Sequence, residues 1–260
     1  MTLLQATVIA IVEGITEYLP ISSTGHMIIT SNLMGIHTDE FTKLYEVAIQ
    51  LGAILAAVLL YWRKFIDLGN WRFYLKLMVA VIPALVFGLL FSDVIDSLLE
   101  SSFTVAVMLL LGGFVLLYID GVFKNQTIDE DAEITNRQAL MIGIWQCLAM
   151  VPGVSRSAAS IIGGMQQNLT RRLAAEFSFF LAVPTMCAAT GYKLLKGYEQ
   201  INQDSIMLLV VGNIVAFVVA MIAIKLFITF LQKYGFRAFG WYRIVVGIIL
   251  LILIQTGVME

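Results

Sequence analysis

Six stretches of this chain are apolar over the length that crosses a lipid bilayer, which takes about 20 helical residues. Lipid offers the backbone no hydrogen-bond partner, so apolar runs of this length predict membrane-spanning helices. The composition agrees, because 60% of the 260 residues are hydrophobic and only 13% are charged, which excludes an ordinary soluble domain. The predicted spans are residues 45–62, 73–92, 103–119, 173–195, 205–231 and 239–256.

Two further apolar stretches are each interrupted by a polar cluster. In residues 3–29 the cluster follows Pro20, and in residues 138–168 it follows Pro152. Proline breaks a helix interior, so each stretch is predicted to be a short helix, a loop and a second short helix. Such a re-entrant hairpin dips into the membrane and returns on the same side. Irregular backbone at that depth survives only if it is buried in protein or lines a wet cavity, which indicates a functional site.

The predicted fold is an all-α integral membrane protein with six transmembrane helices and two re-entrant hairpins. It forms a single domain over residues 1–260, with halves 1–130 and 131–260. Each half holds one hairpin and three spans. Because three is odd, the second half would be inserted upside down relative to the first, as in inverted-topology repeats whose broken helices meet at the bilayer midplane.

Weak internal similarity supports this division of the chain. Pro20 and Pro152 match at one offset, which also pairs Ser23 with Ser155. We therefore expect the two hairpins to enter from opposite faces and to bring their tips together.

The charges of the loops predict the orientation. The loop 63–76 has four basic residues and one acid, whereas the loop 93–102 has three acids and no base. The positive-inside rule places the first in the cytoplasm and the second outside. The net charge of −2 gives no argument for nucleic acid as a partner.

Glu13 and Glu17 are four residues apart, so a helix would place both carboxylates on one face. Two like charges in an apolar setting need a metal ion, a cationic partner or a shared proton. The alternative is that this helix lies at the membrane interface, where both acids are simply hydrated.

Three hydroxyl residues, Ser22, Ser23 and Thr24, follow Pro20, and His26 comes just beyond them. Ser23 is a candidate nucleophile or phosphate donor, and His26 or a glutamate is a candidate proton carrier. A lone histidine is equally well explained by a structural or solvated role.

Arg156 lies deep in an apolar stretch, where a guanidinium costs roughly 2.5–3.5 kcal/mol unless it is paired or hydrated. Its fork of donors suits a phosphate. Further donors surround it: Gly153, Ser155, Ser157 and Ser160. The alternative is a structural salt bridge to one of three acids: Glu13, Glu17 or Glu176. Arg243 opens the last span, where an arginine normally extends to the lipid headgroups, and the alternative is that it holds a lipid phosphate.

Several motifs are absent from the sequence, and their absence narrows the function. The Gly-x-x-x-x-Gly-Lys-Ser/Thr phosphate loop is missing, which argues against ATP as a partner and against an ATP-driven pump. No histidine or cysteine grouping has zinc spacing. Cys147 and Cys187 both lie in apolar segments and suggest no disulfide scaffold.

Three motifs occur in a fixed order: Glu13-x-x-x-Glu17, Pro20-x-Ser22-Ser23-Thr24-Gly25-His26 and Pro152-Gly153-Val154-Ser155-Arg156-Ser157. With them the chain resembles the bacterial undecaprenyl-diphosphate phosphatases, the bacitracin-resistance family, over nearly its whole length. The resemblance implies hydrolysis of the C55 isoprenyl diphosphate to the monophosphate carrier plus phosphate. This recycles the carrier for peptidoglycan synthesis and confers bacitracin resistance. It also implies the bacterial cytoplasmic (inner) membrane, with the active site facing the outer side.

The resemblance carries roles to matching positions. It implies catalytic roles for Glu17, Ser23, His26 and Arg156. Substrate-binding roles are predicted for Ser22, Thr24, Gly153, Ser155, Ser157 and Ser160. A divalent cation, Mg²⁺ or Ca²⁺, is predicted at Glu13 and Glu17. Ala158 and Ser160 depart from the glycine and threonine usual in the family, which leaves the geometry of that turn open.

A different class of function also fits the pattern. Inverted repeats with broken helices suit a carrier or flippase for a lipid phosphate or another anion as well as an enzyme. The nucleophile-like cluster around Ser23 favours the enzyme, because a carrier needs donors but no proton carrier. The predicted partners are undecaprenyl diphosphate and membrane lipid, and the oligomeric state stays open between a monomer and a homodimer.

Overall fold

The structure, a computed structural model, describes the whole chain except residues 68, 100, 202 and 260. Its regular elements are helices, and the only bridge between extended segments in the described part joins Ile128 to Leu169. The α-helices are α1 Leu3–Thr16, α2 Ser23–Leu33, α3 Glu40–Ala48, α4 Gln50–Leu60, α5 Trp62–Ile66, α6 Trp71–Leu90, α7 Ser92–Leu99, α8 Ser102–Val122, α9 Asn136–Cys147, α10 Arg156–Gln166, α11 Arg171–Gly197, α12 Gln203–Tyr234 and α13 Arg237–Gln255.

Six helical segments of the described chain are long and apolar enough to cross a membrane. They are Glu40–Leu60, Trp71–Leu90, Ser102–Val122, Arg171–Gly197, Ser205–Tyr234 and Arg237–Gln255. Each coincides with a predicted span, so the prediction of a multi-pass membrane protein with six spans is confirmed. The first span begins five residues earlier than predicted, at Glu40 rather than at residue 45, because Asp39 caps α3 by accepting a hydrogen bond from the Thr42 N–H.

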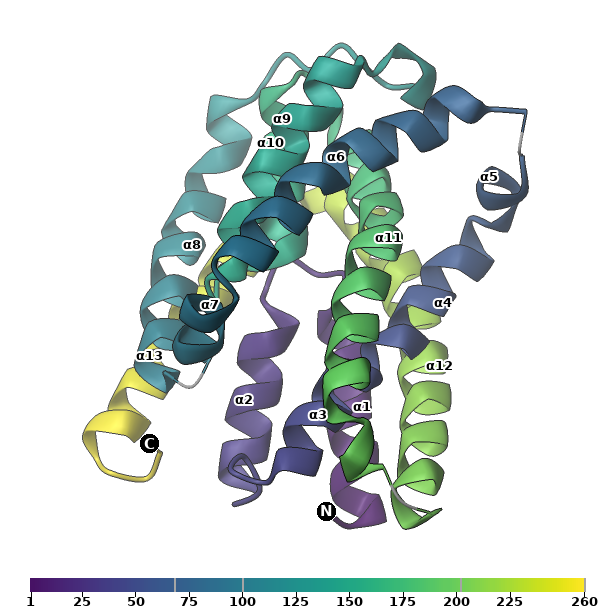
Figure 1. Cartoon of the computed structure of the whole chain (residues 1–260). Helices are drawn as coiled ribbons and strands as arrows, with labels where there is room; N and C mark the ends of the chain where they lie inside the picture. Colours follow the sequence, from purple (N-terminus) through teal and green to yellow (C-terminus); the bar gives the residue numbers. More distant parts are fainter. Residues whose placement is uncertain (68, 100, 202, 260) are drawn as a thin grey trace.

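Each of the two interrupted stretches has the predicted order of short helix, loop and short helix. α1 packs beside α2, and their outer ends lie at the bottom of the molecule in Figure 1. α9 packs beside α10, and their outer ends lie at the top. The connecting loops, residues 17–22 and 151–155, meet in the middle of the bundle.

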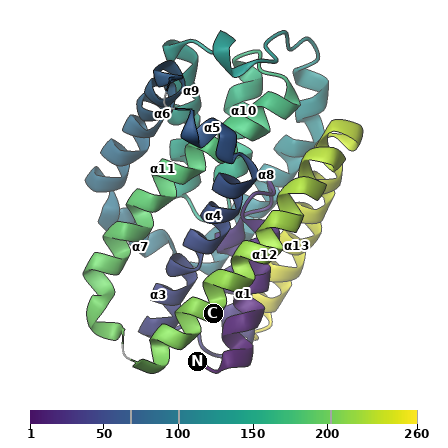
Figure 2. The same ribbon diagram turned by 90° about the vertical axis from the view of Figure 1, so that its right-hand side faces the viewer.

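The first helix of each pair packs against a span from the other half of the chain. α1 packs mainly against α12, whereas α9 packs mainly against α6, and α8 pairs with α13. Figure 2 shows α12 lying alongside α1. Each half of the chain therefore covers the short helix that begins the other half.

The helix pairs begin and turn in the same way. Thr2 caps α1 and Thr135 caps α9, each in a capping box with a glutamine three residues later. Ser22 caps α2 with φ 72°, and Ser155 caps α10 with φ 79°. This shared cap pairs Ser155 with Ser22, so the predicted pairing of Ser155 with Ser23 is wrong by one residue.

Candidate active site

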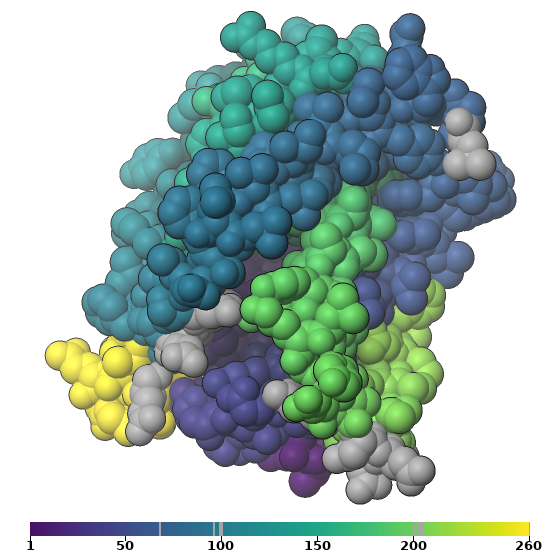
Figure 3. Space-filling view, in the orientation of Figure 1, coloured from purple at the N-terminus to yellow at the C-terminus, as the bar shows by residue number. Residues whose placement is uncertain are grey.

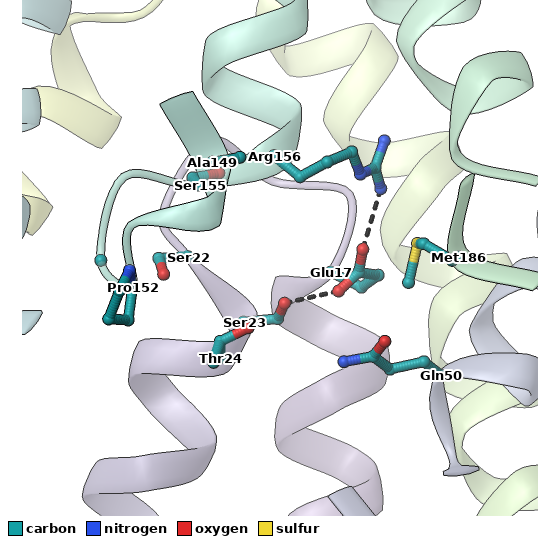
Figure 4. A pocket seen from close by; sticks show the side chains of 11 residues that line it. Glu17, Ser22, Ser23, Thr24, Gln50, Ala149, Pro152, Ser155, Arg156 and Met186 are labelled. Atoms are coloured by element: carbon teal, nitrogen blue, oxygen red, sulfur yellow. Dashed lines mark hydrogen bonds and ion pairs between the residues drawn. The ribbon is translucent and has the colours of Figure 1, made fainter. Parts of the chain in front are cut away.

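Glu17 joins the two helix pairs. It is the C-terminal cap of α1, and its Oε2 accepts a hydrogen bond of 2.5 Å from Ser23 Oγ. Its Oε1 lies 2.8 Å from Nη2 of Arg156, the first residue of α10. Figure 4 shows this chain of contacts running from Ser23 through Glu17 to Arg156. One carboxylate therefore contacts both of the side chains that the sequence marked as the nucleophile and the phosphate clamp.

Tyr18 fixes the position of this carboxylate. Its hydroxyl donates a hydrogen bond of 3.0 Å to the Ala53 carbonyl of α4, and its ring packs edge-on against Phe179 of α11. The Arg156 guanidinium lies over the same ring, 5.5 Å from its centroid. The loop that carries Glu17 is thus held to two spans, and a cation–π contact adds to the ion pair.

Arg156 has further partners on α11. Its Nη1 donates to the Ser178 carbonyl at 2.9 Å and to Ser178 Oγ at 3.2 Å. Ser160 Oγ lies 2.7 Å from Ser178 Oγ and also donates to the Arg156 carbonyl. Nε of Arg156 is buried and has no partner among the described residues. The salt bridge to Glu17 considered from the sequence is present, and one donor of the guanidinium is still available.

Helices α2 and α10 both begin beside Glu17. Ser22 and Ser155 turn the chain in the left-handed region, and each accepts a hydrogen bond from a backbone N–H in the first turn of its helix. Non-glycine residues persist there only where their surroundings hold them. Two helix N-termini direct partial positive charge to the same place, which favours an anion.

A cavity of about 100 Å³ lies at the junction of the two loops. Seven of the predicted site residues line it: Glu17, Ser22, Ser23, Thr24, Gly153, Ser155 and Arg156. Gln50 and Met186 also line it, and no sequence motif marked either residue. The remaining predicted residues are Glu13, His26, Ser157 and Ser160, and they lie outside this lining.

His26 faces away from Ser23. Its Nδ1 lies 2.7 Å from the Ser22 carbonyl, and its Nε2 lies 2.8 Å from the Tyr242 hydroxyl, with the two rings stacked. Both ring nitrogens are therefore engaged by other groups in this arrangement. The geometry places Glu17, and not His26, against the Ser23 hydroxyl.

The other residues outside the lining are buried. Glu13 is fully buried, and neither of its carboxylate oxygens has a hydrogen-bond partner among the described residues. Ser157 is also fully buried, with its hydroxyl unpaired there. Glu13 is thus not at a wet interface, which was the alternative for the acidic pair. Ala158 lies in the first turn of α10 with ordinary helical backbone, so this turn does not need the glycine usual in the family.

Arg243 does not lie where the sequence predicted. It is fully buried in α13 rather than extended to the headgroups. Its guanidinium donates to five backbone carbonyls, those of Pro20, Met108, Leu109, Gly153 and Val154, at distances from 2.7 to 3.3 Å. It therefore ties both loops to α8.

A family model, that of the bacitracin resistance protein BacA, matches residues 6–249 of the chain. The chain belongs to the bacitracin resistance protein family. The match runs from α1 into α13, so it includes both loops and every residue that lines the cavity.

Relatives in this family are similar over nearly their full length. A protein of Flavobacterium johnsoniae is 56% identical, over 97% of this chain and 96% of its own. One of Bdellovibrio bacteriovorus is 52% identical, over 99% and 98%. One of Aquifex aeolicus is 44% identical, over 96% and 97%. Each of the three is named undecaprenyl-diphosphatase.

Proposed function

We propose that this member of the bacitracin resistance protein family is an undecaprenyl-diphosphate phosphatase. It removes the terminal phosphate of the C55 isoprenyl diphosphate, which recycles the monophosphate carrier for peptidoglycan synthesis and confers bacitracin resistance. One observation carries the proposal: Ser23 and Arg156, from the two helix pairs, contact the same carboxylate of Glu17. A phosphate group of similar size and charge can therefore be reached by both side chains.

The proposed reaction begins with attack by Ser23. Ser23 Oγ attacks the terminal phosphorus, its proton passes to Glu17 Oε2, to which it is already hydrogen-bonded, and the isoprenyl monophosphate leaves. Water then hydrolyses the phosphoserine and releases inorganic phosphate. Arg156 and the N-termini of α2 and α10 stabilise the charge on the transferred group, because positioning and electrostatics supply most of the catalysis in phosphoryl transfer.

Glu13 and Glu17 are the proposed ligands of a divalent cation, Mg²⁺ or Ca²⁺. The two unpaired, fully buried oxygens of Glu13 fit such an ion. No three acidic, histidine or cysteine side chains of the described chain gather closely enough to hold it alone. Phosphate oxygens of the substrate would complete the shell, as is usual for Mg²⁺. When bound, the ion would neutralise the repulsion between these acids and the diphosphate.

The helix pairs α1–α2 and α9–α10 are proposed to be re-entrant hairpins of an inverted repeat. Their positions at opposite ends of the molecule, their matching serine caps and the packing of α1 and α9 against the other half of the chain support this. Lys64 of the basic loop forms an ion pair of 2.7 Å with Asp131, just before α9. By the positive-inside rule, the α9–α10 end is then cytoplasmic and the α1–α2 end faces outward.

The protein is proposed to lie in the bacterial inner membrane, with its site facing the outer side. The space-filling view shows a recess between α7 and α11, above α2 and α3, on the side of the proposed outer end (Figure 3). The isoprenyl tail is expected to leave the site sideways between spans into lipid.

Phosphate release from farnesyl diphosphate by purified protein in detergent tests this function. The wild type should release phosphate without a second compartment, and Ser23→Ala and Arg156→Ala should each lower kcat/KM by at least about 100-fold. Elution as a single species with an unchanged melting temperature would show that the variants fold. Full turnover by Ser23→Ala would show that an activated water, and not Ser23, attacks the phosphorus. A folded wild type that releases no phosphate would favour the alternative function, a carrier or flippase for a lipid phosphate or another anion.

A further inference from the structure

The first membrane span is broken beside the cavity. α3 ends at Ala48 and α4 begins at Gln50, although together they form one span. At the break the Gly52 N–H bonds the Ile49 carbonyl, three residues back, instead of the carbonyl four residues back that a regular α-helix would use. Backbone groups freed in this way within a membrane span need other partners.

Two polar side chains from other spans hydrogen-bond the backbone on either side of the break. Asn213 of α12 accepts a hydrogen bond of 2.7 Å from the Gly52 N–H. Thr190 of α11, fully buried, donates one of 3.3 Å to the Val47 carbonyl. A Cβ at Gly52 would lie 2.2 Å from the Asn213 carbonyl oxygen, so the contact requires glycine. Buried polar side chains in spans are costly unless paired, which indicates that the break is a maintained feature.

The break presents Gln50 to the cavity. The Gln50 side chain lines the cavity and extends into it below the Glu17–Ser23 hydrogen bond (Figure 4). Its amide makes no hydrogen bond with another residue of the described chain, whereas Glu17, Ser23 and Arg156 all have partners. An amide offers two N–H donors without a charge, so it can bind a phosphate oxygen beside the Glu17 carboxylate.

We propose that Gln50 is a substrate-binding residue whose amide N–H donates to the diphosphate. Asn213 and Thr190 are positioning residues that hold the break. This inference rests on the proposed function, because the ligand it names is the diphosphate bound between Ser23 and Arg156. Met186 also lines the cavity but its side chain has no N–H or O–H group, so Gln50 is the donor that α4 would offer a phosphate bound there.

The test compares Gln50→Met with Gln50→Glu. Methionine keeps the length of the side chain without the donors, and glutamate replaces the donors with a negative charge. We expect kcat/KM for farnesyl diphosphate to fall about 10- to 100-fold in Gln50→Met and further in Gln50→Glu, with a parallel rise in the inhibition constant of inorganic phosphate. Gln255→Met, at the exposed end of α13, is the matched control. Unchanged kcat/KM and phosphate inhibition in Gln50→Met would overturn the inference.

Binding of farnesyl diphosphate, measured by titration calorimetry, separates this inference from the proposed function. If the wild type binds but does not hydrolyse it, the phosphatase proposal fails, and weaker binding by Gln50→Met still supports a role for Gln50. If the wild type hydrolyses it and Gln50→Met matches the wild type in both assays, only the role of Gln50 fails. If the wild type neither binds nor hydrolyses it, both fail.

A double-mutant cycle tests the positioning role of Asn213. Asn213→Ala should weaken farnesyl diphosphate binding in the same direction as Gln50→Met. The double variant should lose little more than Gln50→Met alone, because both changes remove the same contact. Fully additive losses would show that Asn213 does not act through Gln50.

Discussion

Glu17 makes two contacts that usually belong to separate residues. One of its oxygens accepts a hydrogen bond from Ser23 Oγ, and the other pairs with Arg156. Both side chains are more than four-fifths buried, with relative exposures of 5% for Glu17 and 13% for Arg156. The pair therefore lies where screening by water is weak and where an anion entering the cavity competes directly with Glu17 for the guanidinium.

We predict that Glu17→Gln lowers kcat for farnesyl diphosphate by at least about 100-fold, because the amide is a poor base and no longer balances Arg156. His26→Gln should lower kcat less, since the His26 ring contacts Ser22 and Tyr242 instead of Ser23. Steady-state phosphate release by both variants makes the comparison. A larger loss in His26→Gln than in Glu17→Gln would instead assign the role of general base to His26.

Site residues that stand out from the sequence around them could be predicted, and site residues that do not stand out could not. Arg156 and the serine clusters stand out because polar groups are rare in apolar stretches. Gln50 has no motif around it, and its role depends on a break stabilised by α11 and α12. Arg243 binds only backbone carbonyls, which leave no mark in the sequence.

At the scale of elements, α2 and α10 are the parts that shape the site. Each begins with a serine in the left-handed region, at φ 72° for Ser22 and φ 79° for Ser155. The two prolines predicted one alignment of the segments, but the N-cap serines define another. The capping residue and the start of its helix fix where each side chain points, so the caps are the better guide. This is why the predicted alignment was off by one residue, although the order of helix, loop and helix was correct.

The cap of α10 gives a prediction at this scale. Ser155→Ala removes the cap and keeps the strained backbone, so the free energy of unfolding should fall by about 1 kcal/mol or more. Ser155→Gly also removes the cap, but it adopts a positive φ without strain and should lose only a few tenths. Thermal unfolding in detergent measures both. A glycine variant as unstable as the alanine variant would show that the backbone conformation is not the limiting factor.

At the scale of the whole molecule, the six spans follow from bilayer thickness, which constrains each apolar run separately. How the halves meet depends on contacts between distant segments, and the sequence alone could not supply them. The two loops meet through the Arg156–Glu17 ion pair on one side and Arg243 on the other. The site therefore exists only where the halves are held together.

Arg243 is the strongest of these ties, since its carbonyl partners come from three separate segments of the chain. Arg243→Lys keeps the charge but cannot reproduce the planar fork, so several buried carbonyls lose their donor. We predict that the free energy of unfolding in detergent falls by at least about 2 kcal/mol, with a matching loss of phosphate release. Arg237→Lys, at the exposed start of the same helix, should change stability by less than about 0.5 kcal/mol. Equal stability of the two variants would show that Arg243 is not what holds the loops together.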